Sequence, residues 1–184
     1  LLLSVISDHQ NKPDKVEEYL KKALIIEPFN SEIYANLGVC YRKNNRYFKA
    51  INSYEIAAKL DQNNSELYLT IGNIYAESSS YSKAIKAYEK SLSINTNSHE
   101  AYMNLGITYQ LLGVYPESIY FLKKAISLDG NLSRAKEALI YSEACICEWS
   151  EFPYRRSWLN ELGIKGQSVV PLGLMAKKSL ISYL

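Results

Sequence analysis

Cysteine and histidine are the residue types through which this sequence could bind a metal ion or carry out nucleophilic catalysis. The chain contains three cysteines, Cys40, Cys145 and Cys147, and two histidines, His9 and His99. A structural zinc site needs four closely spaced ligands, and the Cys-x-Cys pair has no second pair or histidine near it. Neither histidine neighbours a nucleophile that it could activate. The sequence therefore predicts reduced thiols, no metal or cofactor, and no catalytic residue.

Charge and hydropathy narrow the class of partner. The 184 residues include 21 Lys and Arg against 19 Asp and Glu, which gives a net charge of +2. This balance, without any run of five like charges, provides no field for a nucleic-acid backbone. The apolar run at residues 1–6 is far shorter than the roughly 20 residues that span a bilayer. We predict a cytoplasmic protein without nucleic-acid or membrane partners, and we expect the chain to be part of a longer protein.

The elements that would position any site follow from a repeat whose period is 34 positions. Small residues, aliphatic residues and eleven of the 16 tyrosines recur at this period. The recurring residues are Gly38, Gly72 and Gly106; Leu37, Ile71 and Leu105; Ala50, Ala84 and Ser118; Ala57, Ser91 and Ala125; Tyr34, Tyr68 and Tyr102; Tyr41, Tyr75 and Tyr109; Tyr47, Tyr81 and Tyr115; and Tyr54, Tyr88 and the replacement Leu122. A fixed period of this length is typical of a solenoid built from one repeated supersecondary unit.

Each unit contains two stretches of helical periodicity. In the first complete copy, apolar residues follow helical spacing over residues 33–41 and again over residues 47–58. The connecting loops are short and polar, so consecutive helices must run antiparallel. A glycine within a helix costs about 1 kcal/mol relative to alanine, so we expect the glycines to permit close approach of paired helices. The predicted repeat-packing residues are Gly38, Gly72, Gly106, Ala50, Ala84, Ala57 and Ala125.

This pattern resembles the tetratricopeptide repeat family, in which aromatic, Leu-Gly, Tyr and Ala positions are fixed within each repeat. The resemblance implies an all-α fold, a superhelix of antiparallel helix pairs whose first helices line a concave groove. It implies an array at residues 1–146, with a partial first repeat at 1–30, complete repeats at 31–64, 65–98 and 99–132, and a degenerate last helix at 133–146. We expect residues 147–184 to provide a C-terminal capping helix and a junction toward a further domain.

The resemblance also implies that a polypeptide partner binds in the groove. The residues expected to contact it are Asn36, Arg42, Thr70, Asn73, Asn104 and Gln110. Asn36, Thr70 and Asn104 form one column, and an amide can donate to and accept from a peptide backbone at once. O-linked N-acetylglucosamine transferases carry a similar asparagine ladder for their substrate polypeptides. The alternative is that Asn36 and Asn104 lie on a solvated face without a ligand.

A second binding mode in this family is the carboxylate clamp, which holds the acidic C-terminus of a chaperone. The clamp needs basic side chains that converge on the groove. The corresponding columns here contain Ala35, Leu69 and Met103, and Glu32, Glu66 and Glu100. A row of three glutamates repels an acidic tail, so the sequence argues against chaperone-tail binding.

The segment after the repeats contains both tryptophans of the chain, Trp149 and Trp158. Exposure of such large apolar side chains is costly, so we expect both to be buried as a cap on a helix at about residues 133–145. The run Cys-x-Trp-Ser and its flanking residues resemble the junction between repeats and catalytic region in bacterial relatives of O-linked N-acetylglucosamine transferase. That resemblance implies a glycosyltransferase parent whose nucleotide-binding domains are absent from this chain.

The sequence therefore predicts a protein–protein interaction module without enzymatic activity of its own, which binds polypeptide in the groove. The alternative, from a different functional class, is a part of a glycosyltransferase whose catalytic domains lie outside this chain.

Overall fold

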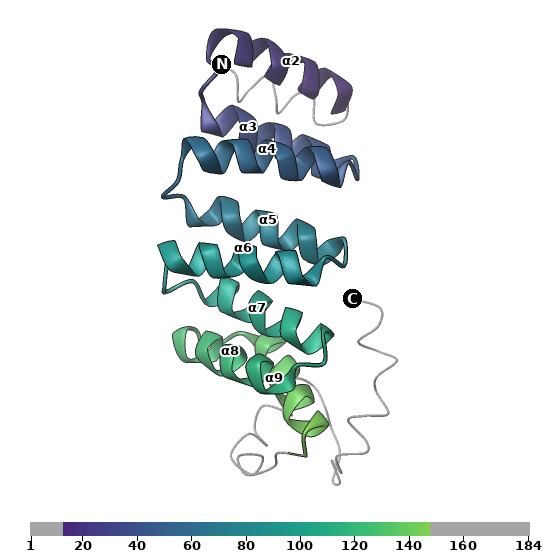
Figure 1. Cartoon of the computed structure of the whole chain (residues 1–184), viewed down its shortest axis with the longest axis vertical. Helices are drawn as coiled ribbons and strands as arrows, with labels where there is room; N and C mark the ends of the chain where they lie inside the picture. The colour runs from purple at the N-terminus through teal and green to yellow at the C-terminus, as the bar shows by residue number, and fades with distance from the viewer. Residues whose placement is uncertain (1–12, 148–184) are drawn as a thin grey trace. The chain divides into compact units, whose positions relative to one another are not determined.

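The computed structural model describes residues 13–147, and all of the regular secondary structure in this range is α-helical (Figure 1). The helices are α2 (Pro13–Ile26), α3 (Ser31–Lys43), α4 (Tyr47–Leu60), α5 (Ser65–Glu77), α6 (Tyr81–Ile94), α7 (His99–Leu111), α8 (Tyr115–Leu128) and α9 (Ser133–Cys145). We call α3, α5, α7 and α9 the first helices, because each begins at the same position of a successive repeat, and α4, α6 and α8 the second helices. The predicted all-α fold is confirmed for the described residues.

The chain divides into two compact units. Among the described residues, the first unit ends at residue 96 and contains α2 to α6, and the second unit begins at residue 97 and contains α7 to α9. In the first unit α3 packs on α4 and α5 packs on α6, while α2 contacts α3 and α4 contacts α5. In the second unit α7 packs on α8, and α9 contacts both. The predicted boundary at residue 147 lies at the edge of the described residues and stays a prediction.

The turn between the two helices of a repeat uses one backbone conformation in a fixed register. Asn45, Ser79 and Gly113 have positive φ angles of 56°, 57° and 75°. In all three turns, the N–H groups of this residue and of its successor donate to carbonyls of the preceding helical turn at 2.8–3.0 Å. This pattern is the Schellman cap, which satisfies carbonyls that the helix end leaves free. Cys147, with a φ of 58°, continues the register, so α9 ends as the earlier first helices do.

Close approach of the paired helices in the first unit depends on glycines that face tyrosine rings. A Cβ atom added to Gly38 would lie 2.6 Å from Cε2 of Tyr54, and one added to Gly72 would overlap the ring of Tyr88. Both rings are buried. Since a side chain at either glycine would force a packed ring to move, the aromatic residue fills the space that the glycine leaves.

An acidic side chain attaches α2 to the first complete repeat. The carboxylate of Glu17 accepts hydrogen bonds from the Tyr41 hydroxyl at 3.0 Å and from Arg46 at 2.9 Å, and it pairs with Lys21 at 2.7 Å. The hydrogen bond from Lys21, with further contributions from Tyr41 and Arg46, lowers the pKa of Glu17. Leu20 on the same helix is fully buried, so α2 completes the core of the first unit.

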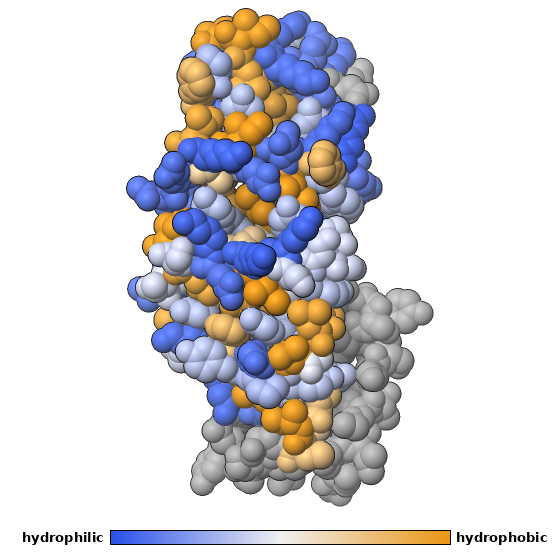
Figure 2. All heavy atoms as spheres, in the orientation of Figure 1, coloured by the Kyte–Doolittle hydropathy of each residue, from blue (hydrophilic) through white to orange (hydrophobic). Residues whose placement is uncertain are grey.

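Apolar side chains gather at the surface over α2 (Figure 2). Ile25, Ile26 and Phe29, at the end of α2 and in the following turn, are each 82% exposed. The residues that stand one repeat after Ile25 and Phe29 are Lys59 and Asn63, which are polar. The first described helix thus ends in an apolar surface. Two of its three side chains have polar counterparts in the following repeat, whereas Leu60, the counterpart of Ile26, is apolar.

The second unit packs differently. A Cβ atom at Gly106 would lie 2.7 Å from Cγ of Leu122, so a leucine stands where the first unit has a tyrosine. The neighbouring Phe121 stacks on Tyr109, with ring centroids 5.5 Å apart and an angle of 11° between the planes. It also stacks on Tyr102 at 6.3 Å. The aromatic residue has moved by one position along α8, and its ring now covers the tyrosines of α7.

Candidate functional site

The first helix α3 presents four side chains in one line, which we call the α3 stripe. Glu32, Asn36, Val39 and Lys43 follow the spacing i, i+4, i+7, i+11, which places them on one side of a helix. Glu32 and Lys43 are exposed, Asn36 is half-buried, and Val39 is 41% exposed. The stripe therefore begins with a carboxylate, continues with an amide and an apolar group, and ends with an ammonium group.

The equivalent α5 stripe consists of Glu66, Thr70, Asn73 and Glu77. Both glutamates are exposed, whereas Thr70 and Asn73 are half-buried. Asn73 accepts a hydrogen bond of 2.8 Å from the hydroxyl of the buried Tyr88, so the helix-pair core holds its side chain in place. Unlike the α3 stripe, the α5 stripe is acidic at both ends.

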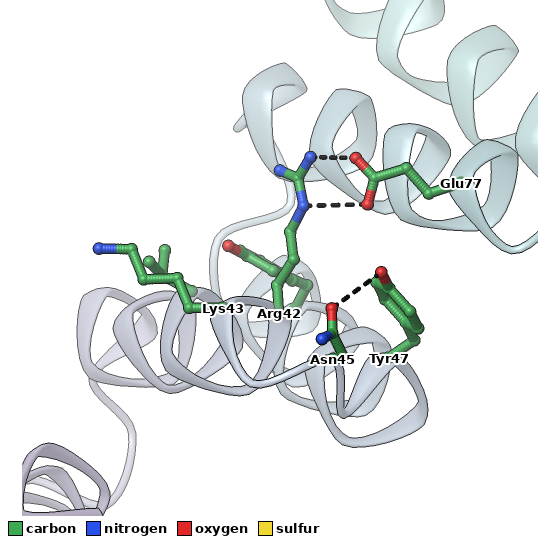
Figure 3. Close-up of a pocket in the computed structure, with 7 residues that line it drawn as sticks. Arg42, Lys43, Asn45, Tyr47 and Glu77 are labelled. Carbon is green, nitrogen blue, oxygen red and sulfur yellow. Dashed lines mark hydrogen bonds and ion pairs between the residues drawn. The ribbon is translucent and has the colours of Figure 1, made fainter. Parts of the chain in front are cut away.

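A hollow of about 380 Å³ lies where α3 ends and α4 begins. Its lining residues are Val39, Arg42, Lys43, Asn45, Tyr47, Tyr54 and Glu77. The left-handed turn places Asn45 so that its side-chain oxygen accepts a hydrogen bond of 3.2 Å from the Tyr47 hydroxyl. Figure 3 shows Arg42 reaching toward Glu77 while Lys43 points away from it. The hollow thus combines apolar and aromatic walls with two cationic side chains and one carboxylate.

Arg42 and Glu77 form a two-point ion pair that joins α3 to α5. Nε of Arg42 donates to Oε2 of Glu77 at 3.2 Å, and Nη2 donates to Oε1 (Figure 3). The hydrogen bonds to Glu77 raise the pKa of Arg42. Such a fork fixes the plane of the guanidinium group. Within residues 13–147, Nη1 of Arg42 bonds no acceptor, so one edge of the group remains able to donate.

The sequence singled out Arg42 but not its pairing with Glu77. The two residues are 35 positions apart, one more than the repeat period, so a comparison of repeat columns does not bring them together. Their opposite charges at the ends of successive first helices were the available signal.

The predicted groove residues fall into two sets, one in each unit. Asn36, Thr70, Asn73 and Arg42 lie on α3 and α5 of the first unit, and Asn104 and Gln110 lie on α7 of the second unit. Asn104 is half-buried, and its backbone carbonyl accepts the Thr108 hydroxyl at 2.7 Å. The ladder predicted from Asn36, Thr70 and Asn104 stays a prediction.

The side chain of Gln110 takes part in the packing of α9. Its amide nitrogen donates to the Ala138 carbonyl at 2.8 Å and to the Ser142 hydroxyl at 2.9 Å. Ser142 in turn lies 3.0 Å from the hydroxyl of Ser118 on α8, and both serines are fully buried. One polar network therefore ties α9 to both other helices of the second unit.

The predicted packing and cap residues can be placed in part. Gly38, Gly72 and Gly106 are buried, and no surface of Ala50, Ala84, Ala57 or Ala125 is exposed. Trp149 and Trp158 lie outside the described residues, as does the predicted capping helix.

Cysteines and acidic residues offer little chemistry in the described part of the chain. Cys40 is buried within α3, Cys145 is half-buried and Cys147 is exposed, all as free thiols. Between residues 13 and 147, no three Cys, His, Asp or Glu side chains gather as metal ligands. None of the described helices combines the length and the apolar character that a bilayer span requires.

Comparison with known proteins identifies the repeat. Models of the tetratricopeptide repeat match residues 19–52 and 99–132, and a TPR repeat model matches residues 72–113. No curated protein matches the sequence.

Solved structures resemble the chain over most of its length. A crystal structure of MamA is 23% identical, with 92% of this chain and 96% of that chain covered and a TM-score of 0.76. MamA from Desulfovibrio magneticus RS-1 is 18% identical, with 91% of this chain and 96% of that chain covered and a TM-score of 0.77. PilF of Pseudomonas aeruginosa is 16% identical, with 99% of this chain and 84% of that chain covered and a TM-score of 0.74. At such identities the likeness concerns the fold. Together with the family models, it shows that the helix pairs of this chain are tetratricopeptide repeats.

Proposed function

We propose that the chain is a protein–protein interaction module and that an extended polypeptide segment binds along its first helices. The observation that carries this proposal is the surface formed by the α3 and α5 stripes beside the hollow. Arg42 and Glu77 hold the two helices together at one end of this surface. Its amide and hydroxyl groups are partly accessible, whereas Tyr54 and Tyr88 of the same repeats are buried in the helix-pair packing.

The chemistry of the stripes suits a polypeptide backbone. Asn36 can donate and accept hydrogen bonds at once, and Thr70 on the next first helix can do the same through its hydroxyl. Backbone groups of an extended segment need such partners, while the apolar wall of the hollow can cover one of its side chains. Binding would then depend on the backbone for affinity and on the hollow for selectivity.

A wider role as the arm of a glycosyltransferase stays a prediction. Its support is the motif around residues 145–158, most of which lies outside the described residues. Cytoplasmic location is likewise a prediction from the sequence.

Selection from a random peptide display library on the full chain tests the interaction proposal. The double variant Asn36→Ala/Thr70→Ala should bind the selected peptides at least about fivefold more weakly, since it removes two polar contacts of about 0.5–1.5 kcal/mol each, or about 1–3 kcal/mol together. The matched control is Asn52→Ala/Ser82→Ala, which removes an exposed amide and an exposed hydroxyl from the second helices. It should bind as the parent does.

Either of two results would count against the proposal. One is a selection in which no peptide sequence is enriched. The other is an equal loss of affinity in the stripe variant and in the control.

A further inference from the structure

The two ends of the α3 stripe carry opposite charges. Glu32 lies in the first turn of α3 and Lys43 in the last, eleven residues apart, which corresponds to about 16 Å along a helix. Glu66, in the first turn of α5, adds a second carboxylate at the acidic end of the surface. Among the described residues, Glu32, Glu66 and Lys43 form no ion pair, so none of these charges is neutralised within the fold.

The basic end coincides with the hollow. Arg42 and Lys43 contribute two positive charges, and Glu77 offsets one of them while it orients Arg42. The free Nη1 edge of Arg42 can donate to an anionic group, and Lys43 has a flexible stem that can approach the same group. Val39 and Tyr54 provide apolar walls beside these charges. The hollow is therefore suited to an acidic side chain that has an apolar neighbour.

We propose that the segment recognised by the first unit is dipolar. It carries an acidic residue over the hollow and a basic residue over Glu32 and Glu66. An extended chain advances about 3.3 Å per residue, so the two charged residues are separated by about five positions. This inference rests on the proposed function and adds the chemical class of the partner. A wholly acidic or wholly basic segment would place a like charge against one end of the stripe, which disfavours it.

A series of synthetic peptides with blocked termini tests the spacing. Each peptide carries one Lys and one Glu, separated by two, five or nine positions, in both orders, with the same apolar residue beside Glu. Companion peptides replace Glu by Lys or by Gln, or both charged residues by Gln. Binding to the full chain is measured by fluorescence anisotropy. The Lys–Glu peptide with a separation of five positions should bind about fivefold more tightly than the peptides with separations of two or nine positions. It should also bind more tightly than the Lys–Lys peptide.

Charge reversal at the basic end provides the decisive variant. Lys43→Glu makes both ends of the α3 stripe acidic, so this variant should prefer the Lys–Lys peptide over the Lys–Glu peptide at the same separation. The control Lys86→Glu makes the same change in net charge at an exposed position on α6 and should keep the preference of the parent. Should Lys43→Glu fold poorly, Lys43→Gln serves instead and should weaken the discrimination between the Lys–Glu peptide and its Lys–Gln counterpart to the part that Arg42 provides, whereas unchanged discrimination would overturn the role of Lys43.

The outcomes separate this inference from the function on which it rests. The dipolar inference would be overturned if affinity followed the net charge of the peptide alone. It would also be overturned if Lys43→Glu and Lys86→Glu changed the peptide preference equally. Tight binding of the uncharged peptides at every spacing would overturn it as well, although the interaction module would then stand. Absence of binding by every peptide, including those obtained by selection, would remove the proposed function itself.

Discussion

The two units build the same repeat with different partners for the same glycine. In the first unit, Tyr54 and Tyr88 fill the space that their facing glycines leave, whereas in the second unit Leu122 does so. Phe121 then supplies the missing aromatic group from the next position of α8 and stacks on Tyr109. The comparison teaches that the register of small residues determines the helix spacing, while the large residue opposite can be exchanged.

The surfaces of the first helices differ as well. The α3 stripe runs from a carboxylate to an ammonium group, but the equivalent line on α7, the α7 stripe, ends in Leu111, which is 57% exposed. Gln110, beside it, is bonded to α9. One scaffold thus supports opposite charges at the two ends of the α3 stripe in the first unit, and a stripe that ends in an exposed leucine in the second.

Removal of a buried tyrosine ring should cause the largest loss of stability among these variants. Tyr88 is 1% exposed, so Tyr88→Ala should lower the free energy of unfolding by about 3–5 kcal/mol, the range for deletion of a buried aromatic side chain. Tyr120→Ala is the control, because that ring is 65% exposed and should contribute far less. Urea denaturation followed by circular dichroism measures both. Equal midpoints for the two variants would remove the assignment of Tyr88 to the core.

Addition of a methyl group at the facing glycines sharpens the same comparison. Overpacking costs about 1–3 kcal/mol, which exceeds the roughly 1 kcal/mol that a helix gains from Gly→Ala. Gly72→Ala should destabilise more than Gly106→Ala, because the added Cβ would lie closer to the Tyr88 ring than the one at Gly106 would lie to Leu122, and the Tyr88 ring is held at its hydroxyl by Asn73. Gly130→Ala serves as the control, because a Cβ atom at that position would lie within 4 Å of no residue beyond its chain neighbours. Thermal melting that ranks Gly106→Ala as the more destabilising change would contradict this account.

The helices were predictable from the sequence because their signals are local and repeated. The register of the repeat predicts where α3, α5 and α7 begin, and the polar loops predict the turns. Pro116 lies in the first turn of α8, where its missing N–H removes no hydrogen bond within the helix. Because each position is seen in several repeats, one atypical side chain does not obscure the helix pattern.

The candidate site was less predictable, because it depends on contacts that do not repeat. The Arg42–Glu77 pair is out of step with the repeat and exists only where those two residue types meet. Gln110 was expected in the groove, yet its side-chain N–H group donates hydrogen bonds to α9. The repeat pattern does not predict its partner Ser142, because α9 belongs to the degenerate last repeat. Such contacts follow from rotamers and from the specific neighbour across the helix pair.

Disruption of the buried polar network in the second unit should cause the next smaller loss of stability. Ser142→Ala should cost about 1–2 kcal/mol, since it deprives the Gln110 amide and the buried Ser118 hydroxyl of a partner. Ser127→Ala, which removes an exposed hydroxyl bonded only to its own helix, should change the free energy of unfolding by less than about 0.5 kcal/mol. Differential scanning calorimetry on both variants gives the comparison. A Ser142→Ala variant as stable as the parent would mean that the network does not hold α9.

The smallest expected effect concerns the apolar surface at the end of α2. The double variant Ile25→Lys/Phe29→Asn copies Lys59 and Asn63 of the following repeat, and both replaced side chains are exposed. Its free energy of unfolding should stay within about 0.5 kcal/mol of the parent, while its solubility should rise. Static light scattering and chemical denaturation measure the two quantities. A large loss of stability would show that Ile25 and Phe29 belong to the core after all.

The central claim is that polypeptide binds along the stripes of the first helices in the first unit. Two-dimensional ¹H–¹⁵N NMR spectra of the full chain, recorded during titration with a selected peptide, test it most directly. The account predicts that the largest shift changes fall on the α3 and α5 stripes and on the residues around the hollow, with side-chain amide signals of Asn36 among them. Shift changes confined to the exposed faces of α4 and α6, or to the α7 stripe of the second unit, would contradict it.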